Sequence, residues 1–156
     1  MPGYKGHLFG GCIAYSVVMY AAHAAACVNP SVLTALEWFG FTLAGSLFPD
    51  IDTKSKGQKY LYGVLLALFV FLLGTDRVEL AAALGILALV PIVVRHRGLF
   101  HRPWFVIMFP LAVALIITRH CAVPNAVLFI DAFFFIVGAL SHLILDLGFR
   151  RTLGWQ

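Results

Sequence analysis

Histidine and aspartate residues recur in short polar blocks of this chain, at spacings that suit metal binding. In the last block, Ser141-His142-Leu143-Ile144-Leu145-Asp146, an imidazole and a carboxylate stand at positions i and i+4. These positions are neighbours on one helix face, so both side chains can reach one ion. A carboxylate in an apolar membrane helix is costly and usually marks function. The alternative is a simple hydrogen bond between His142 and Asp146.

A pair of carboxylates, Asp50 and Asp52, follows Pro49. Proline disfavours helical continuation and favours an extended conformation in its predecessor, and in an extended segment residues i and i+2 point the same way. The two carboxylates would then repel each other unless a divalent cation lay between them. We therefore expect this pair to bind metal. The alternative is a solvated turn before Lys54 and Lys56.

A third block combines two histidines with arginines. His96 and His101 are five residues apart, a spacing that cannot share one face of a regular helix, but Gly98 permits a turn that brings both imidazoles to one centre. Arg97 and Arg102 are planar, permanently charged donors that suit phosphate oxygens. The alternative is that the arginines only anchor the chain at the membrane surface.

Together with His7, these blocks supply four imidazoles and three carboxylates without a thiolate. Imidazole suits Zn, Fe and Ni, and carboxylate also suits Mn and Mg. This donor set predicts a hydrolytic site of one to three divalent ions, with zinc favoured and Mn or Fe as alternatives. The candidate ligands are His7, Asp50, Asp52, His96, His101, His142 and Asp146.

The composition places the chain in a bilayer. Of its 156 residues, 62% are hydrophobic and 12% are charged, against about 45–50% and about 25% in soluble domains. Apolar runs occupy roughly 8–27, 32–48, 60–74, 78–94, 104–118 and 126–147, and a helical span needs about 17–25 residues. We predict one domain, residues 1–156, with an all-α fold: a polytopic membrane bundle of about six transmembrane helices. Because two runs are short, five spans with a re-entrant segment remain an alternative.

Six spans would alternate the ends of the helices between two sides of the membrane. One side receives the N-terminus, the loops 49–59 and 95–103 and the C-terminal tail, and it carries nine of the eleven Lys and Arg residues. The positive-inside rule places that side, with both termini, in the cytoplasm. All seven candidate ligands fall at this end. The positive-inside rule therefore explains why the Lys and Arg residues gather at one end, and no specific nucleic-acid partner is expected.

The order of these blocks resembles the YdjM-type family of inner-membrane metal-dependent hydrolases. The resemblance rests on His7 and on the patterns P-D-x-D at 49–52, H-R-G-x-x-H at 96–101 and S-H-x-x-x-D at 141–146. That family is in turn similar to zinc-dependent phospholipase C and to S1/P1-type nucleases. The resemblance implies an inner-membrane location and metal binding by the seven ligands. Phe100 and Arg102 differ from the Thr and Ser that usually flank the second histidine.

We therefore expect a membrane-embedded hydrolase that cleaves a phosphoester, such as a lipid head group, at the cytoplasmic interface. A metal-activated water, with its pKa lowered to roughly 7, would be the nucleophile. Asp50 or Asp52 would act as base, and Arg97 and Arg102 would stabilise charge on the phosphate. The expected partners are the lipid bilayer and a phospholipid or phosphorylated substrate, and no oligomeric state follows from the sequence.

Two other functions use the same ligands. A metal-handling or transporter-like protein would need a continuous polar path, which the opposite end of the helices does not supply. A non-catalytic membrane protein would use the metal as a structural clamp between helix ends. An open coordination position distinguishes a catalytic site from a structural one.

Overall fold

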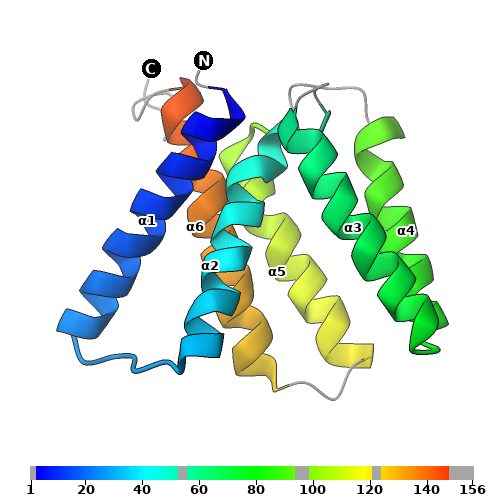
Figure 1. Cartoon of the computed structure of the whole chain (residues 1–156), viewed down its shortest axis with the longest axis horizontal. Coiled ribbons are helices and arrows are strands. Elements are labelled where there is room, and N and C mark those ends of the chain that lie inside the picture. The colour runs from blue at the N-terminus through cyan, green and yellow to red at the C-terminus, as the bar shows by residue number, and fades with distance from the viewer. Residues whose placement is uncertain (1–2, 53–55, 94–98, 121–123, 148–156) are drawn as a thin grey trace.

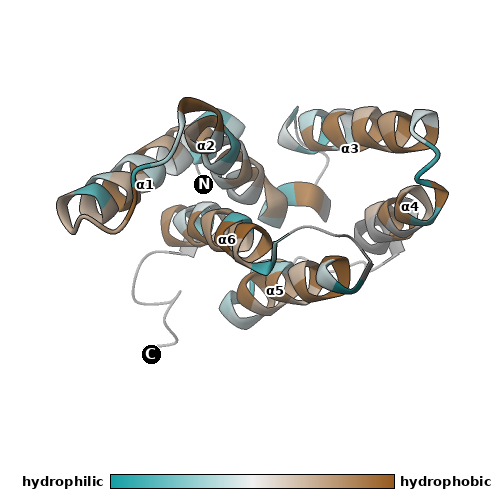
Figure 2. Cartoon of the chain, turned by 90° about the horizontal axis from the view of Figure 1, so that it is seen from below, coloured by the Kyte–Doolittle hydropathy of each residue, from teal (hydrophilic) through white to brown (hydrophobic). Residues whose placement is uncertain are grey.

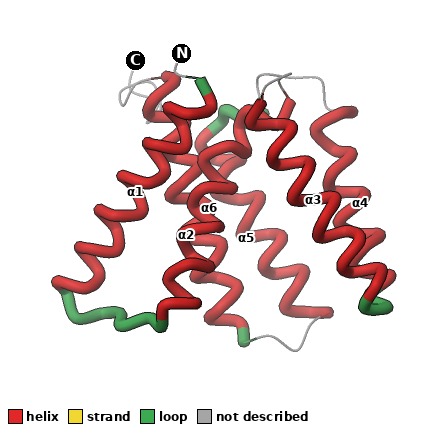
Figure 3. Tube along the Cα trace, viewed as in Figure 1, coloured by secondary structure: helices red, strands yellow, loops and turns green. Residues whose placement is uncertain are grey.

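The computed structural model describes residues 3–52, 56–93, 99–120 and 124–147, apart from the side chain of Asp52 and a few near helix ends or in α4. Its α-helices are α1 (Tyr4–Ala24), α2 (Val32–Leu47), α3 (Lys56–Gly74), α4 (Val78–Val93), α5 (Pro103–His120) and α6 (Asn125–Leu147). A 3-10 helix, η1 (Phe48–Asp52), continues α2. The described residues form no strand, which confirms the predicted all-α fold (Figure 3).

The six helices run alternately up and down, so their ends gather in two groups (Figure 1). The beginnings of α1, α3 and α5 lie at the same end as η1 and the end of α6. We call this the polar end, because it carries the blocks of His and Asp. The connectivity therefore brings segments from the whole length of the chain into one region.

Among the described residues, three helical stretches are long and apolar enough to cross a membrane: Val32–Ile51, Lys56–Gly74 and Asn125–Asp146. Pro103–Arg119 forms a shorter apolar helix. Large hydrophobic side chains such as Val64 and Phe71 are exposed along α3, and hydrophobic residues recur on the outward faces of the helices (Figure 2). The chain is thus a membrane protein of six helices, and the number of full spans stays a prediction.

The closest packing in the bundle is between α2 and α6. A Cβ at Gly138 would overlap the carbonyl oxygen of Thr42, and one at Gly45 would overlap that of Phe135, so only glycine fits at either position. Thr42 and Ser46 are fully buried beside this crossing. Small residues allow membrane helices to approach closely where apolar burial alone supplies no driving force. This contact fixes α2 and α6 relative to each other.

The helices α3 and α4 form a hairpin that contacts the rest of the bundle mainly through η1 and the end of α2. Within the hairpin, the Tyr62 hydroxyl donates to the Ala88 carbonyl at 3.0 Å. At its attachment, the Gln58 side-chain amide donates to the Ile51 carbonyl at 2.8 Å. The hairpin is therefore tied to the bundle at the polar end (Figures 1 and 2).

The segment after α2 differs from its predicted conformation. Phe48 has helical angles, φ −61° and ψ −42°, and Pro49 lies within the 3-10 turn, so the predicted extended conformation is wrong. Proline is tolerated at the start of a helical turn, because its missing N–H would be unsatisfied there and its φ suits a helix. In a 3-10 helix residues i and i+2 do not share a face, so the argument for convergence of Asp50 and Asp52 does not hold.

Candidate metal centre

Five predicted ligands converge at the polar end. His7 comes from the first turns of α1, Asp50 from η1, His101 from the turn before α5, and His142 and Asp146 from the end of α6. One donor atom each from Asp50, His101, His142 and Asp146 lie within 4.8 Å of one another. The Nε2 atom of His7 lies 3.5 Å from Asp146 Oδ1 and 4.0 Å from Asp50 Oδ2. Residues separated by up to 139 positions thus meet at one place.

The distances in this cluster suit donors that share an ion. His142 Nε2 lies 3.7 Å from Asp50 Oδ1 and 3.6 Å from Asp146 Oδ2. His101 Nε2 lies 3.9 and 3.8 Å from the same two oxygens. These separations exceed the about 2.7–3.2 Å of an N–H···O hydrogen bond. Donors about 2.0–2.2 Å from a zinc-like ion lie roughly 3.3–3.6 Å apart in tetrahedral geometry, and up to about 4.4 Å apart across the ion.

The two carboxylates divide their oxygens between two groups of histidines. His7 faces Oδ2 of Asp50 and Oδ1 of Asp146. His101 and His142 face the remaining oxygen of each carboxylate. Each carboxylate therefore faces His7 with one oxygen and faces His101 and His142 with the other, while the rings of His7 and His142 also lie directly against each other.

The orientation of His142 is set by the backbone of α2. Its Nδ1 atom lies 2.8 Å from the carbonyl oxygen of Ser46, and both residues are fully buried. Because a carbonyl only accepts, Nδ1 carries the proton and donates it, which leaves Nε2 with a lone pair. The ring also stacks on that of His7, with centroids 3.7 Å apart. A histidine held in this way by a carbonyl is the usual arrangement for a metal ligand.

Several polar atoms of the cluster are buried without a hydrogen bond. His142 Nε2 and Asp146 Oδ1 have none within the described part of the chain, and an unsatisfied buried polar atom costs about 1–3 kcal/mol. A divalent cation would satisfy both. His7 and Asp146 are 1% and 4% exposed, whereas His101 and Asp50 are 16% and 21% exposed. The residues therefore fit a metal ion, which would be accessible on the side of His101 and Asp50.

Four other predicted site residues are not placed in this cluster by the structure. His96, Arg97 and the side chain of Asp52 fall outside the described residues. Arg102 is exposed on the turn that follows His101, where its backbone N–H donates to the Leu99 carbonyl at 3.1 Å. The roles predicted for these four residues stay predictions.

The residues that position His142 contribute no ligand-type side chain and were not among the predicted site residues. Ser46 acts through its backbone carbonyl, which no motif of ligand types reveals. Gly45 and Gly138 act by allowing α2 to approach α6. The signal that could have identified this contact is the run of small residues in both helices: Thr42, Gly45 and Ser46 in one, Gly138, Ala139 and Ser141 in the other.

One family model matches the chain along nearly its whole length. The family described as "YdjM inner membrane protein" matches residues 1–154. No match was found among curated proteins or among solved structures, so the similarity to zinc-dependent phospholipases and nucleases stays a prediction. The family match covers nearly the whole chain, including every residue of the cluster, and this chain therefore belongs to the YdjM inner membrane protein family.

Proposed function

We propose that this protein is a membrane-embedded, metal-dependent hydrolase that cleaves a phosphoester bond at the cytoplasmic surface of the inner membrane. The observation that carries the proposal is the convergence of three imidazole Nε2 atoms on two carboxylates, at separations of 3.5–4.0 Å. These separations suit ligands around an ion and are too long for direct hydrogen bonds.

In the proposed reaction, the oxygen of a water molecule forms a bond to phosphorus and the bond between phosphorus and the ester oxygen breaks. A divalent ion would supply Lewis-acid chemistry, lowering the pKa of water to about 7 and neutralising phosphate charge. Asp50 and His101 lie on the accessible side of the cluster, where a substrate would approach. Asp50 or Asp52, whichever is not fully committed to metal, would accept the proton of the water. The carboxyl group that accepted this proton passes it to the leaving oxygen, which departs as an alcohol. Arg102, with Arg97, would hold the phosphate oxygens through charged hydrogen bonds.

The division of the carboxylate oxygens supports two ion positions. His101 and His142 would hold one ion and His7 the other, with Asp50 and Asp146 contributing an oxygen to each. Two such ions would supply Lewis-acid chemistry to both the attacking water and the leaving oxygen. Zinc suits the imidazoles, and Mn or Fe would also suit a site this rich in carboxylate.

Aromatic residues near the cluster support a location at the depth of lipid head groups. Trp104 is 54% exposed at the start of α5. Tyr4 and Tyr60 form a pair with ring centroids 6.0 Å apart at the starts of α1 and α3. Trp and Tyr are enriched where a membrane meets water. A substrate in this position would be the head group of a phospholipid.

The proposal is tested by metal analysis of detergent-purified protein, followed by assays of phosphate or head-group release from phospholipid vesicles. We expect bound metal and release of product in the wild type. His7→Ala should reduce the content from about two ions per chain to about one, because it removes a ligand of only one position. Metal without turnover on any phospholipid class would contradict the proposal, as would protein that binds no metal.

The second candidate function is a structural clamp. The near-complete burial of His7, His142 and Asp146 favours it, because a structural metal joins helix ends without needing access for a substrate. A clamp would make the melting temperature depend on metal while giving no turnover. Transport receives less support, because the described residues contain no second group of candidate metal ligands.

A further inference from the structure

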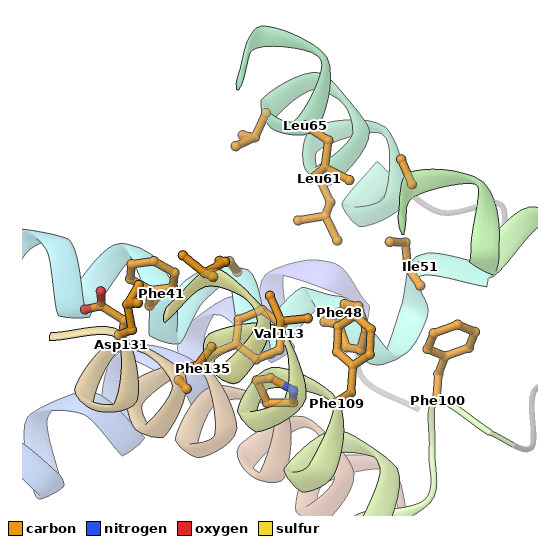
Figure 4. Close-up of a pocket in the computed structure, with 18 residues that line it drawn as sticks. Phe41, Phe48, Ile51, Leu61, Leu65, Phe100, Phe109, Val113, Asp131 and Phe135 are labelled. Carbon is orange, nitrogen blue, oxygen red and sulfur yellow. The ribbon is translucent and has the colours of Figure 1, made fainter. Parts of the chain in front are cut away.

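An apolar cavity of about 280 Å³ lies between α3 and the group formed by α2, α5 and α6 (Figure 4). This volume is close to the lower end of the about 300–1,000 Å³ of ligand pockets. Every residue that lines the cavity is apolar except Asp131. Leu61 and Leu65 of α3 face Phe109 and Val113 of α5 across it. The cavity is therefore suited to a hydrocarbon group.

At its upper end the cavity is lined by two residues that lie close to metal ligands along the chain. Phe48 and Phe100 line this end and pack edge to face with ring centroids 5.5 Å apart. Phe48 stands two residues before Asp50, and Phe100 directly precedes His101. A ligand that occupies the cavity would thus have its upper end at the level of the metal ligands.

The depth of the cavity corresponds to one leaflet of a bilayer. Asp131 lines its lower end, eleven residues before His142 on the same helix, which is about 16 Å at ~1.5 Å per residue. The hydrocarbon core of a bilayer is about 30 Å thick, so the chains of one leaflet span about 15 Å. An acyl chain that begins at the metal centre would end near Asp131.

The cavity can be reached from the membrane. The α3–α4 hairpin contacts the rest of the bundle mainly through η1 and α2, and the ribbons of α3 and α5 lie apart when the bundle is seen from below (Figure 2). Val64, which lines the cavity, is 64% exposed. Lipid chains that surround the helices could therefore enter from the side, without passing through water.

We propose that this cavity binds one acyl chain of a phospholipid and thereby places the phosphoester of its head group at the metal centre. The inference rests on the proposed function, whose substrate it assigns to membrane lipids with a chain of about one leaflet's length. The apolar lining accepts the chain because it is as apolar as the bilayer core that the chain leaves, so the transfer exposes no hydrocarbon to water. The metal centre selects the phosphate.

The test uses the full chain in vesicles of phosphatidylglycerol that carries a photoreactive diazirine at the end of one acyl chain. Labelled residues are identified by peptide mass spectrometry. We expect preferential labelling at the lower end of the cavity, at Leu128 and Asp131, over exposed positions such as Leu115 and Phe133. Labelling spread evenly over cavity and outer surface would overturn the inference.

A pair of variants on α5 sharpens the test. Val113→Trp fills the cavity, whereas Leu115→Trp introduces the same side chain at a position that is 52% exposed. Val113→Trp should lose the labelling of Leu128 and Asp131 while keeping its metal, and Leu115→Trp should keep both. Labelling unchanged in Val113→Trp would overturn the inference. If that variant fails to fold, the labelling map of the wild type decides alone.

The two proposals fail in different ways. Labelling in the cavity without hydrolysis of any phospholipid would support the acyl-chain site and contradict the proposed hydrolase. Hydrolysis of a soluble, short-chain phosphoester with no preferential labelling of the cavity would support the hydrolase and overturn the acyl-chain site.

Discussion

The imidazole of His142 lies between a backbone carbonyl and two carboxylates, and each neighbour constrains one of its nitrogens. Nδ1 donates to Ser46 at 2.8 Å, while Nε2 faces Asp50 and Asp146 at 3.7 and 3.6 Å. The simple hydrogen bond that the i,i+4 spacing also allowed is therefore not formed between His142 and Asp146. Since the proton resides on Nδ1, the lone pair of Nε2 is available to a cation.

We predict that His142→Ala and Asp146→Ala each weaken metal binding by at least about 100-fold. Loss of a residue that merely supports a ligand already costs about 10–100-fold. His23→Ala should change nothing, because His23 is exposed and sixteen residues from His7, about 24 Å along α1. Metal affinity after chelation and reloading is the measurement, with thermal melting as the folding control. Equal losses in all three variants would indicate a folding defect.

The elements that position His142 are α2 and α6, which cross where neither backbone leaves room for a side chain. Gly45 and Gly138 stand at this crossing. Gly45 directly precedes Ser46, and Gly138 lies one turn before His142, so the close approach brings the carbonyl of one helix to the imidazole of the other. The contact between α2 and α6 therefore both packs the small residues together and orients the imidazole of His142.

We predict that Gly45→Ala destabilises the protein, because its Cβ would overlap a backbone oxygen that cannot move independently of α6. Overpacking typically costs about 1–3 kcal/mol, and this rigid contact should lie at the upper end. The matched control on the same helix is Gly40→Ala, which has nothing within 4 Å of the added atom. It should be neutral or up to about 1 kcal/mol more stable, from helix propensity. Melting in detergent measures both, and equal melting temperatures would refute the close-contact argument.

Across the whole molecule, the alternation of the helices determines which loops share a membrane surface. The starts of α1, α3 and α5 lie with the end of α6 at the polar end (Figure 1). In the sequence, nine of the eleven Lys and Arg residues belong to this end, whereas Arg77 and Arg119 belong to the opposite one. The distribution of cations favours a cytoplasmic position for the metal centre and both termini.

This orientation is tested by cysteine labelling in intact cells, after the native residues Cys12, Cys27 and Cys121 are replaced. A cysteine at Ser55 should react with a membrane-impermeant reagent only after permeabilisation, because it belongs to the cation-rich end. A cysteine at Asn125, at the start of α6, should react in intact cells. Labelling of Ser55 in intact cells would reverse the orientation.

Hydropathy and residue spacing were sufficient to predict the all-α fold, the approximate helix limits and the end of the bundle at which the ligand types gather. The run 126–147 corresponds to α6 (Asn125–Leu147), and 8–27 to α1 (Tyr4–Ala24). These features follow from local hydropathy and from the alternation of short-looped helices, neither of which requires knowledge of long-range contacts. The i,i+4 relation of His142 and Asp146 follows from helix geometry in the same way.

Four features could not be predicted and are seen only in the folded structure. They are the 3-10 turn at Pro49, the carbonyl partner of His142, the division of the carboxylate oxygens and the cavity beneath the site. Each of these depends on how far helices approach and how they are rotated about their axes. Those quantities are set by side-chain volumes at contacts such as that between Gly45 and Gly138, which join residues far apart in the chain. Hydropathy and spacing describe one segment at a time, so they do not predict how closely two helices approach or how each is rotated about its axis.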